Sequence, residues 1–174
     1  MPERHGLLAA GNFIIDHVKI IDEYPAPEML TNIRSQSSSN GGGPYNVLKD
    51  LAKMEAPFPL EAMGLIGNDA GGDWIIGDCQ DHGIATWGLA RSKAAATSYT
   101  DAMTVARGGQ RTFFHHRGAN AIFGVNDIDL SQSNAKWFYL GYLLLLDDLD
   151  EVDRDGMTGA SIALNRAGEA GFRT

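Results

Sequence analysis

The sequence of 174 residues predicts an α/β protein. Three short apolar runs are typical of buried strands and lie at residues 6–10, 60–66 and 137–146. Segments with helical spacing begin near Gly41 and Asp69, each directly after a turn. Gly108-Gly109 separates two strand-like runs and is a two-residue hairpin signal. Strands that alternate with helices favour a parallel sheet, and we expect the hairpin to project from that sheet as a flap.

The composition is that of a folded protein and excludes several function classes. Hydrophobic residues make up 44% and charged residues 21%, so disorder of the whole chain is not expected. The net charge of −8 argues against a nucleic-acid partner, because contact with phosphates needs a basic face. Cys79 is the only cysteine, which excludes an intrachain disulfide and a CxxC zinc site.

The apolar segments are too short for a targeting or membrane role. The N-terminal run Leu7–Ala10 is too brief for a signal-peptide core. The most apolar window, residues 137–146, is far below the length of a membrane helix. We therefore expect a cytoplasmic protein without a membrane partner.

The first strand is expected at residues 6–10, where Gly11-Asn12 closes it, and the second at residues 13–21. Prolines 25 and 27 break the second strand, since proline cannot donate to a ladder. The serine-rich segment 30–39 fits either an exposed strand or a loop.

Two helices frame the central strand. Leu48 and Leu51 share one face of the helix that the glycine run opens, and Pro44 suits its first turn. After the strand at 60–66, Asp69 is placed to cap a helix that stops at His82-Gly83. Further elements are expected in this order: a hairpin of strands 97–106 and 110–116, a buried strand 137–146, a loop 147–155, a helix 157–170 and a strand starting at 172.

The strongest local signal for a binding site is Gly41-Gly42-Gly43-Pro44-Tyr45-Asn46. Glycines before a helix let a ligand approach the backbone, and the first N–H groups of the helix can meet it. Asn46, one turn into the helix, can both donate and accept, as recognition of a hydroxyl requires. The alternative, a flexible entry loop with a favourable cap, fits the run equally well.

Asp16 has two interpretations. An acid among apolar neighbours in a strand is usually an edge residue that faces water. It can instead face a pocket, where its carboxylate accepts hydrogen bonds from two ligand hydroxyls.

Other motifs argue against competing functions. His115 and His116 are adjacent in a strand and point to opposite faces, which disfavours a metal site. No lysine follows a glycine, so a Walker A loop is absent, and no G-x-S-x-G elbow supports a hydrolase.

Taken in order, four segments resemble the N-terminal part of the PfkB (ribokinase-like) carbohydrate kinase family. They are Gly11-Asn12 followed by Asp16, then Gly41-Gly42-x-Pro44-x-Asn46, then Gly67-x-Asp69-x-x-Gly72, and finally the hairpin that returns into Gly118-Ala119-Asn120. Each segment is weak alone, but four in this order over nearly the whole chain are fairly specific.

The resemblance implies a ribokinase-like, doubly wound (Rossmann-like) sheet with a small β-sheet lid. Residues 1–174 would be the N-terminal part of a single kinase domain, with its C-terminal half missing and lid segments at about 17–40 and 97–116. The implied reaction is transfer of the ATP γ-phosphate to a sugar hydroxyl, with Mg²⁺ bridging the phosphates. By position in the motifs, the implied substrate-binding residues are Asp16, Gly42, Gly43 and Asn46.

The sequence departs from the family pattern in ways that narrow these expectations. Ribokinases have an acid after the strand that corresponds to 137–142, whereas this chain has Gly141, Tyr142 and Leu143, which argues against ribose. The family's Gly-Ala-Gly-Asp turn, which supplies the catalytic base, is absent from the sequence. We therefore expect no catalytic residue in this chain and no phosphate transfer by the chain alone.

The sequence leaves two alternative functions and one oligomeric state open. A nucleoside kinase of the same fold would place aromatic residues such as Phe13 or Tyr99 in the pocket. A non-catalytic sugar-binding remnant would bind sugar without ATP. The lid can serve as a dimer interface in this family, so a homodimer through the lid is a further alternative.

Overall fold

The computed structural model describes residues 3–174 and confirms the predicted α/β fold. Its first sheet has four parallel strands in the order β5-β4-β1-β8. Their bounds are β1 Leu7–Gly11, β4 Leu60–Gly67, β5 Ala85–Ser92 and β8 Trp137–Gly141. Because the strands are parallel, the carboxyl ends of β1 and β8 meet at the same edge of the sheet.

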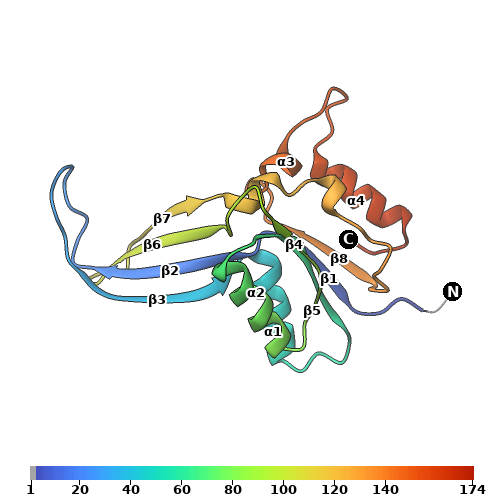
Figure 1. The fold of residues 1–174 in the computed structure, drawn as a ribbon, viewed down its shortest axis with the longest axis horizontal. Coiled ribbons are helices and arrows are strands. Elements are labelled where there is room, and N and C mark those ends of the chain that lie inside the picture. Colours follow the sequence, from blue (N-terminus) through green and yellow to red (C-terminus); the bar gives the residue numbers. More distant parts are fainter. Residues whose placement is uncertain (1–2) are drawn as a thin grey trace.

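Helices cover both faces of the first sheet, as expected of a doubly wound fold (Figure 1). One face packs on α1 (Gly43–Lys53) and α2 (Ala70–Asp81), with Phe13, Leu48 and Ile75 fully buried between the layers. The other face packs on α3 (Asp147–Asp150), α4 (Gly159–Glu169) and the 3₁₀ segment η1 (Gly118–Ile122). A short 3₁₀ turn, η2 (Val125–Asp127), follows η1.

A second sheet projects from this three-layer body (Figure 1). It consists of β2 (Ile14–Ile21), β3 (Ile33–Gly41), β6 (Tyr99–Val105) and β7 (Arg111–His116), in the order β3-β2-β6-β7. The β2–β6 pair is parallel and the two outer pairs are antiparallel. The predicted hairpin around Gly108-Gly109 thus forms half of this sheet.

The chain passes from the first sheet into the second between Gly11 and Ile14. Phe13, which lies at this crossing, has no exposed surface and anchors it in the core. Side chains alternate from here on, so Ile14 and Asp16 face one side of the second sheet while Ile15 faces the helical core.

Several elements differ from the expectations. The strand β5 was not predicted, because only Leu89 and Ser92 of it are buried and its apolar signal is weak. The strand β8 ends at Gly141 rather than at 146, and Leu143 and Leu144 are exposed. Part of the expected acidic loop is the short helix α3, which buries Leu149. The serine-rich segment, which fitted either an exposed strand or a loop in the sequence, forms most of the strand β3.

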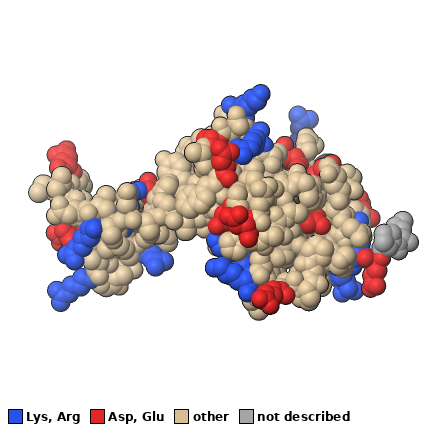
Figure 2. Space-filling view, turned by 60° about the horizontal axis from the view of Figure 1, so that its bottom comes forward, with Lys and Arg blue, Asp and Glu red and all other residues tan. Residues whose placement is uncertain are grey.

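Acidic and basic side chains are interspersed over the face of the molecule shown in Figure 2. Among the helices of residues 3–174, none is both long and apolar enough to cross a membrane. Pairs of opposite charge at the surface include Arg91–Asp73, with a nitrogen–oxygen distance of 2.6 Å.

Asp69 joins the first sheet to the second. Its Oδ1 accepts from the Gly72 amide at 2.9 Å, which caps α2, and from the Thr97 hydroxyl at 2.6 Å. Its Oδ2 accepts from the Thr97 amide at 2.8 Å, directly before β6. Burial raises the pKa of Asp69, but these hydrogen bonds outweigh burial and hold the pKa below its ordinary value.

Asp69→Ala is expected to lower the free energy of unfolding by about 2–4 kcal/mol, since it removes a helix cap and leaves buried donors of Thr97 unpaired. Because the folded-state pKa is depressed, the stabilisation by Asp69 is present above its unfolded pKa and is lost as pH falls through the folded one. Urea unfolding at several pH values measures both effects.

The matched control is Asp73→Ala, which removes the surface pair with Arg91 and an acidic side chain from the first turn of α2, and is expected to cost about 1 kcal/mol. Equal losses of stability for the two variants would contradict the proposed role of Asp69 in linking the two sheets through hydrogen bonds.

Candidate functional site

A cavity of about 630 Å³ lies where the second sheet meets the carboxyl ends of β1 and β8. This edge is where doubly wound sheets bind ligands. The floor comes from the residues that follow β1 and β8 and from the start of α1, and one wall comes from the second sheet. The residues that line it are Asn12, Ile14, Asp16, Gly42, Asn46, Thr100, Arg111, Phe113, His115, Tyr142 and Leu145.

Asn12 fixes the floor of the cavity. Its Oδ1 accepts from the Gly43 amide at 3.2 Å and from the Tyr142 amide at 2.9 Å, so one side chain links β1, α1 and the segment after β8. The residue is 1% exposed, and within residues 3–174 its Nδ2 has no hydrogen-bond partner. A buried amide donor without a partner is costly, so this donor is left available for a further hydrogen bond.

Asp16 faces the cavity from β2, a strand between β3 and β6. The interpretation as an edge residue that faces water is therefore wrong. In the described part of the chain its carboxylate makes no side-chain hydrogen bond or ion pair. Burial raises the pKa of Asp16, and the nearby His17 offsets part of this rise. The carboxylate is free to accept hydrogen bonds from a ligand.

The glycine run brings the backbone close to these two side chains. Gly42 has φ +99°, and a Cβ there would lie 2.0 Å from the Asn12 carbonyl oxygen. A Cβ at Gly41 would lie 2.1 Å from Asp16 Oδ2, so the run has to be glycine for Asp16 to keep its place. Asn46 lies exposed at the cavity rim, one turn into α1.

Gly43 differs from the expectation. It does not line the cavity, and its amide donates to Asn12 rather than to a ligand. Pro44 has no N–H and the Gly43 amide donates to Asn12, so these two positions at the start of α1 offer no N–H to a ligand. The structure thus brings Asp16, Gly42 and Asn46 together at the cavity and gives Gly43 a supporting position.

The two aromatic residues expected in a nucleoside pocket lie elsewhere. Phe13 is fully buried in the core. Tyr99 lies on the opposite face of the second sheet, between His17 and His116, with ring centroids 5.7 Å and 5.0 Å away. Phe113 and Tyr142 line the cavity instead.

Sequence reasoning missed Asn12, Thr100, His115 and Tyr142 as site residues. Position directly after a buried strand was the signal available for Asn12. The pairing of Thr100 with His115 was not predictable from the hairpin turn, because a two-residue turn at Gly108-Gly109 would have placed Thr100 opposite Arg117. No group of three or more potential metal-ligating side chains occurs within residues 3–174.

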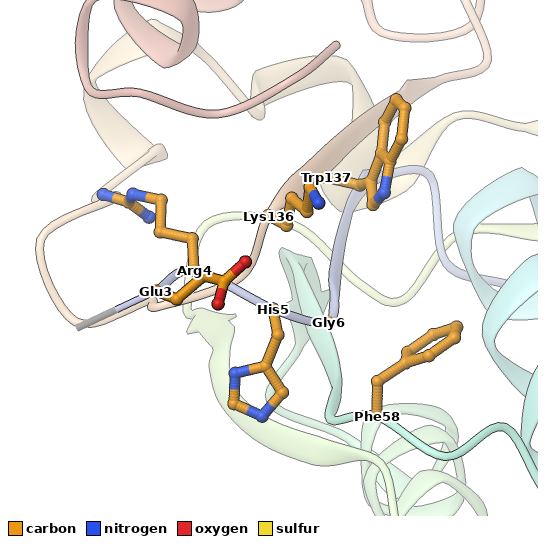
Figure 3. A pocket seen from close by; sticks show the side chains of 7 residues that line it. All are labelled: Glu3, Arg4, His5, Gly6, Phe58, Lys136 and Trp137. Atoms are coloured by element: carbon orange, nitrogen blue, oxygen red, sulfur yellow. The ribbon is translucent and has the colours of Figure 1, made fainter.

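A second cavity of about 530 Å³ lies at the opposite, amino ends of the parallel strands (Figure 3). It is lined by Glu3, His5, Phe58 and Trp137, among others. Arg4, also in its lining, donates to the carbonyl oxygens of Ser133, Ala135 and Ala170, which tie the N-terminal segment to the body. This cavity lies away from the ligand-binding edge of the fold.

Residues 5–158 match the pfkB family of carbohydrate kinases. The chain belongs to this family. The expectation drawn from the four motifs is thereby confirmed.

Solved structures share the fold of this pfkB family chain at low sequence identity. The protein Sa239 has a TM-score of 0.77 at 20% identity, over 95% of this chain and 51% of that one. Arabidopsis thaliana ribokinase, complexed with ribose and ATP, has a TM-score of 0.66 at 22% identity, over 79% and 45%. Methanocaldococcus jannaschii nucleoside kinase has a TM-score of 0.66 at 14% identity, over 79% and 44%. The chain therefore spans about half the length of the structures that it matches. No curated protein sequence matches it.

Gly42→Ala is expected to lower the free energy of unfolding by about 1–3 kcal/mol, because the new Cβ meets the Asn12 carbonyl and the backbone keeps a positive φ. The control is Gly77→Ala in α2, where a Cβ would meet nothing within 4 Å. That change is expected to raise stability by about 0.5–1 kcal/mol through helix propensity. Thermal melts measure the stability change of both variants. A Gly42→Ala protein as stable as the wild type would contradict the packing described.

Proposed function

We propose that the cavity binds a sugar, and that this chain supplies the substrate side of a carbohydrate kinase. The observation that carries the proposal is that two polar groups without side-chain hydrogen-bond partners of their own lie at the same cavity. Asp16 offers a half-buried carboxylate, and Asn12 offers a buried amide N–H₂. A carboxylate accepts from two hydroxyls and an amide donates to a hydroxyl oxygen, so together they match a polyhydroxy compound.

The rest of the cavity supports the same ligand class. Asn46 at the rim can donate and accept, and the bare backbone at Gly42 leaves room for a sugar ring beside Asp16. Ile14 gives an apolar contact for the carbon face of a ring. The proposed substrate-binding residues are thus Asp16, Gly42, Asn46 and the amide of Asn12, and Gly43 holds Asn12 in place.

For the complete reaction we propose ATP as phosphate donor with Mg²⁺, in line with the family. The described cavity lining offers one cation, Arg111, and one carboxylate, Asp16, which is less than a phosphate cradle with a magnesium site needs. At the start of α1 the Gly43 amide donates to Asn12 and Pro44 has no N–H. The Gly-Ala-Gly-Asp turn is also absent from the sequence. We therefore assign the transfer step to no residue of this chain and expect sugar binding without phosphate transfer.

The second sheet is proposed as the lid, with segments at about 17–40 and 97–116. A lid over the cavity would exclude water and so suppress hydrolysis of ATP. A homodimer through the lid belongs to the same proposal, supported by the exposed apolar side chains of Phe114 and Ile33 on its strands. The cytoplasmic location stays a prediction.

Asp16→Asn is expected to weaken sugar binding at least about tenfold, the effect of losing a hydrogen bond to a charged group. The melting temperature is not expected to fall, because Asp16 has no protein partner to lose. Since burial raises its pKa, wild-type affinity should be constant near neutral pH and fall as pH drops through that raised pKa. Calorimetric titration with D-fructose and D-ribose measures these effects.

Asp50→Asn, an exposed change on α1 outside the cavity lining, is the control and should leave affinity unchanged. Wild-type protein that binds neither sugar, or an Asp16→Asn variant that binds as well as the wild type, would sink the proposed function.

A nucleoside is the second candidate substrate, because Phe113 and Tyr142 give the cavity an aromatic wall. If the substrate carries a base, adenosine should bind more tightly than ribose, and Phe113→Ala should weaken adenosine about tenfold through lost stacking. Ribose affinity should not change. Calorimetry with the two compounds decides between sugar and nucleoside, and equal affinities would count against the nucleoside.

A further inference from the structure

The cavity at the amino ends of the parallel strands has no part in the proposed function. Its volume of about 530 Å³ lies within the range typical of small-molecule sites. Two of its aromatic side chains stay in contact with solvent: Trp137, the first residue of β8, is 47% exposed, and Phe58, between α1 and β4, is 37% exposed. Aromatic side chains that surround a cavity and remain exposed are typical of surfaces that bind a ligand.

Backbone hydrogen bonds hold both aromatic walls in place (Figure 3). The Gly6 carbonyl oxygen accepts from the Trp137 amide at 3.1 Å. The Leu7 amide donates at 3.0 Å to the carbonyl oxygen of Pro59, the residue directly after Phe58. The segment that leads into β1 thus fixes one wall at the start of β8 and the other at the start of β4, so the cavity is formed before a ligand arrives.

The charges of the lining favour an anion, although the whole protein has a net charge of −8. Lys136 lies directly before Trp137, and in the described part of the chain it forms no ion pair. Arg4 is a second cation, but its guanidinium already donates to three carbonyl oxygens. Glu3 is the one carboxylate of the lining. A cationic ligand would have Glu3 as its only charged partner and would be repelled by both cations, whereas an anion can pair with Lys136.

We propose that this cavity is a second small-molecule site, which binds a planar aromatic carboxylate. The ring of the ligand packs on the Trp137 indole and contacts Phe58, and its carboxylate pairs with the Lys136 ammonium. The site is independent of the proposed function, because it lies at the opposite end of the parallel strands from the sugar cavity.

The experiment adds naphthalene-2-carboxylate, as the probe, to the 174-residue protein. In ¹H–¹⁵N spectra, the indole Nε1–H signal of Trp137 is expected to shift as the probe is added. Trp74 and Trp87 are internal controls, because they are 41% and 38% exposed but lie outside the lining, and their signals should stay in place. A Trp137 signal that does not move at millimolar probe, or that moves no more than the other two, overturns the proposal.

A second measurement tests the recognition of charge. Lys136→Gln is expected to weaken binding of the carboxylate about two- to fivefold, as loss of a solvent-accessible ion pair does. Lys53→Gln, an exposed change on α1 outside the lining, is the matched control and should bind the probe as the wild type does.

A neutral probe makes the same comparison without any variant. 2-Naphthamide has the rings of the first probe but no charge, and the wild type should bind it more weakly than the carboxylate by a similar factor. Equal affinities for the two probes, or a Lys136→Gln protein that binds the carboxylate as tightly as the wild type, overturn an aromatic carboxylate as the ligand. Neither result bears on the sugar cavity.

Discussion

The side chain of Asn12 holds three parts of the chain together at the floor of the cavity. Its carbonyl oxygen accepts from the amides of Gly43 and Tyr142, which lie far from it in the sequence. These two hydrogen bonds tie the start of α1 and the segment after β8 to one side chain at the end of β1. The same geometry leaves the amide nitrogen of Asn12 unpaired, so the group that builds the floor also offers a binding function.

The position of Asp16 follows from the short crossing between the two sheets. The chain leaves the first sheet at Gly11 and enters the second at Ile14, with Phe13 locked in the core. Because side chains alternate in a strand, this anchor turns Ile14 and Asp16 toward the cavity and Ile15 toward the helices. A shift of one residue would bury the carboxylate against the core. Thr100 and His115 meet the same face because β6 and β7 are in register with β2.

Sequence patterns predicted the parts of this arrangement that depend on local physics. Apolar runs located β1 and β4, and helical spacing with Pro44 and Asp69 located α1 and α2. The family motifs brought Asp16, Gly42 and Asn46 to notice, and the structure places all three at one cavity.

Features that depend on distant contacts were not predictable in this way. The supporting position of Gly43 depends on Asn12, which approaches it only in the folded chain. The leucines after Gly141 show no periodic pattern that distinguishes exposed Leu144 from buried Leu146. The sequence therefore predicted a strand that extends beyond the true end of β8. The position of His115 at the cavity depends on cross-strand register, which the hairpin turn alone does not fix.

The central claim is that a polyhydroxy ligand completes the unsatisfied groups between the two sheets. Side-chain amide signals in ¹H–¹⁵N spectra test it directly, because Asn12 and Asn46 line the cavity whereas Asn134 is exposed and outside its lining. On addition of D-fructose, the account predicts shifts of the Asn12 and Asn46 amides and none for Asn134. Saturating sugar that leaves the Asn12 signal unmoved would contradict the account.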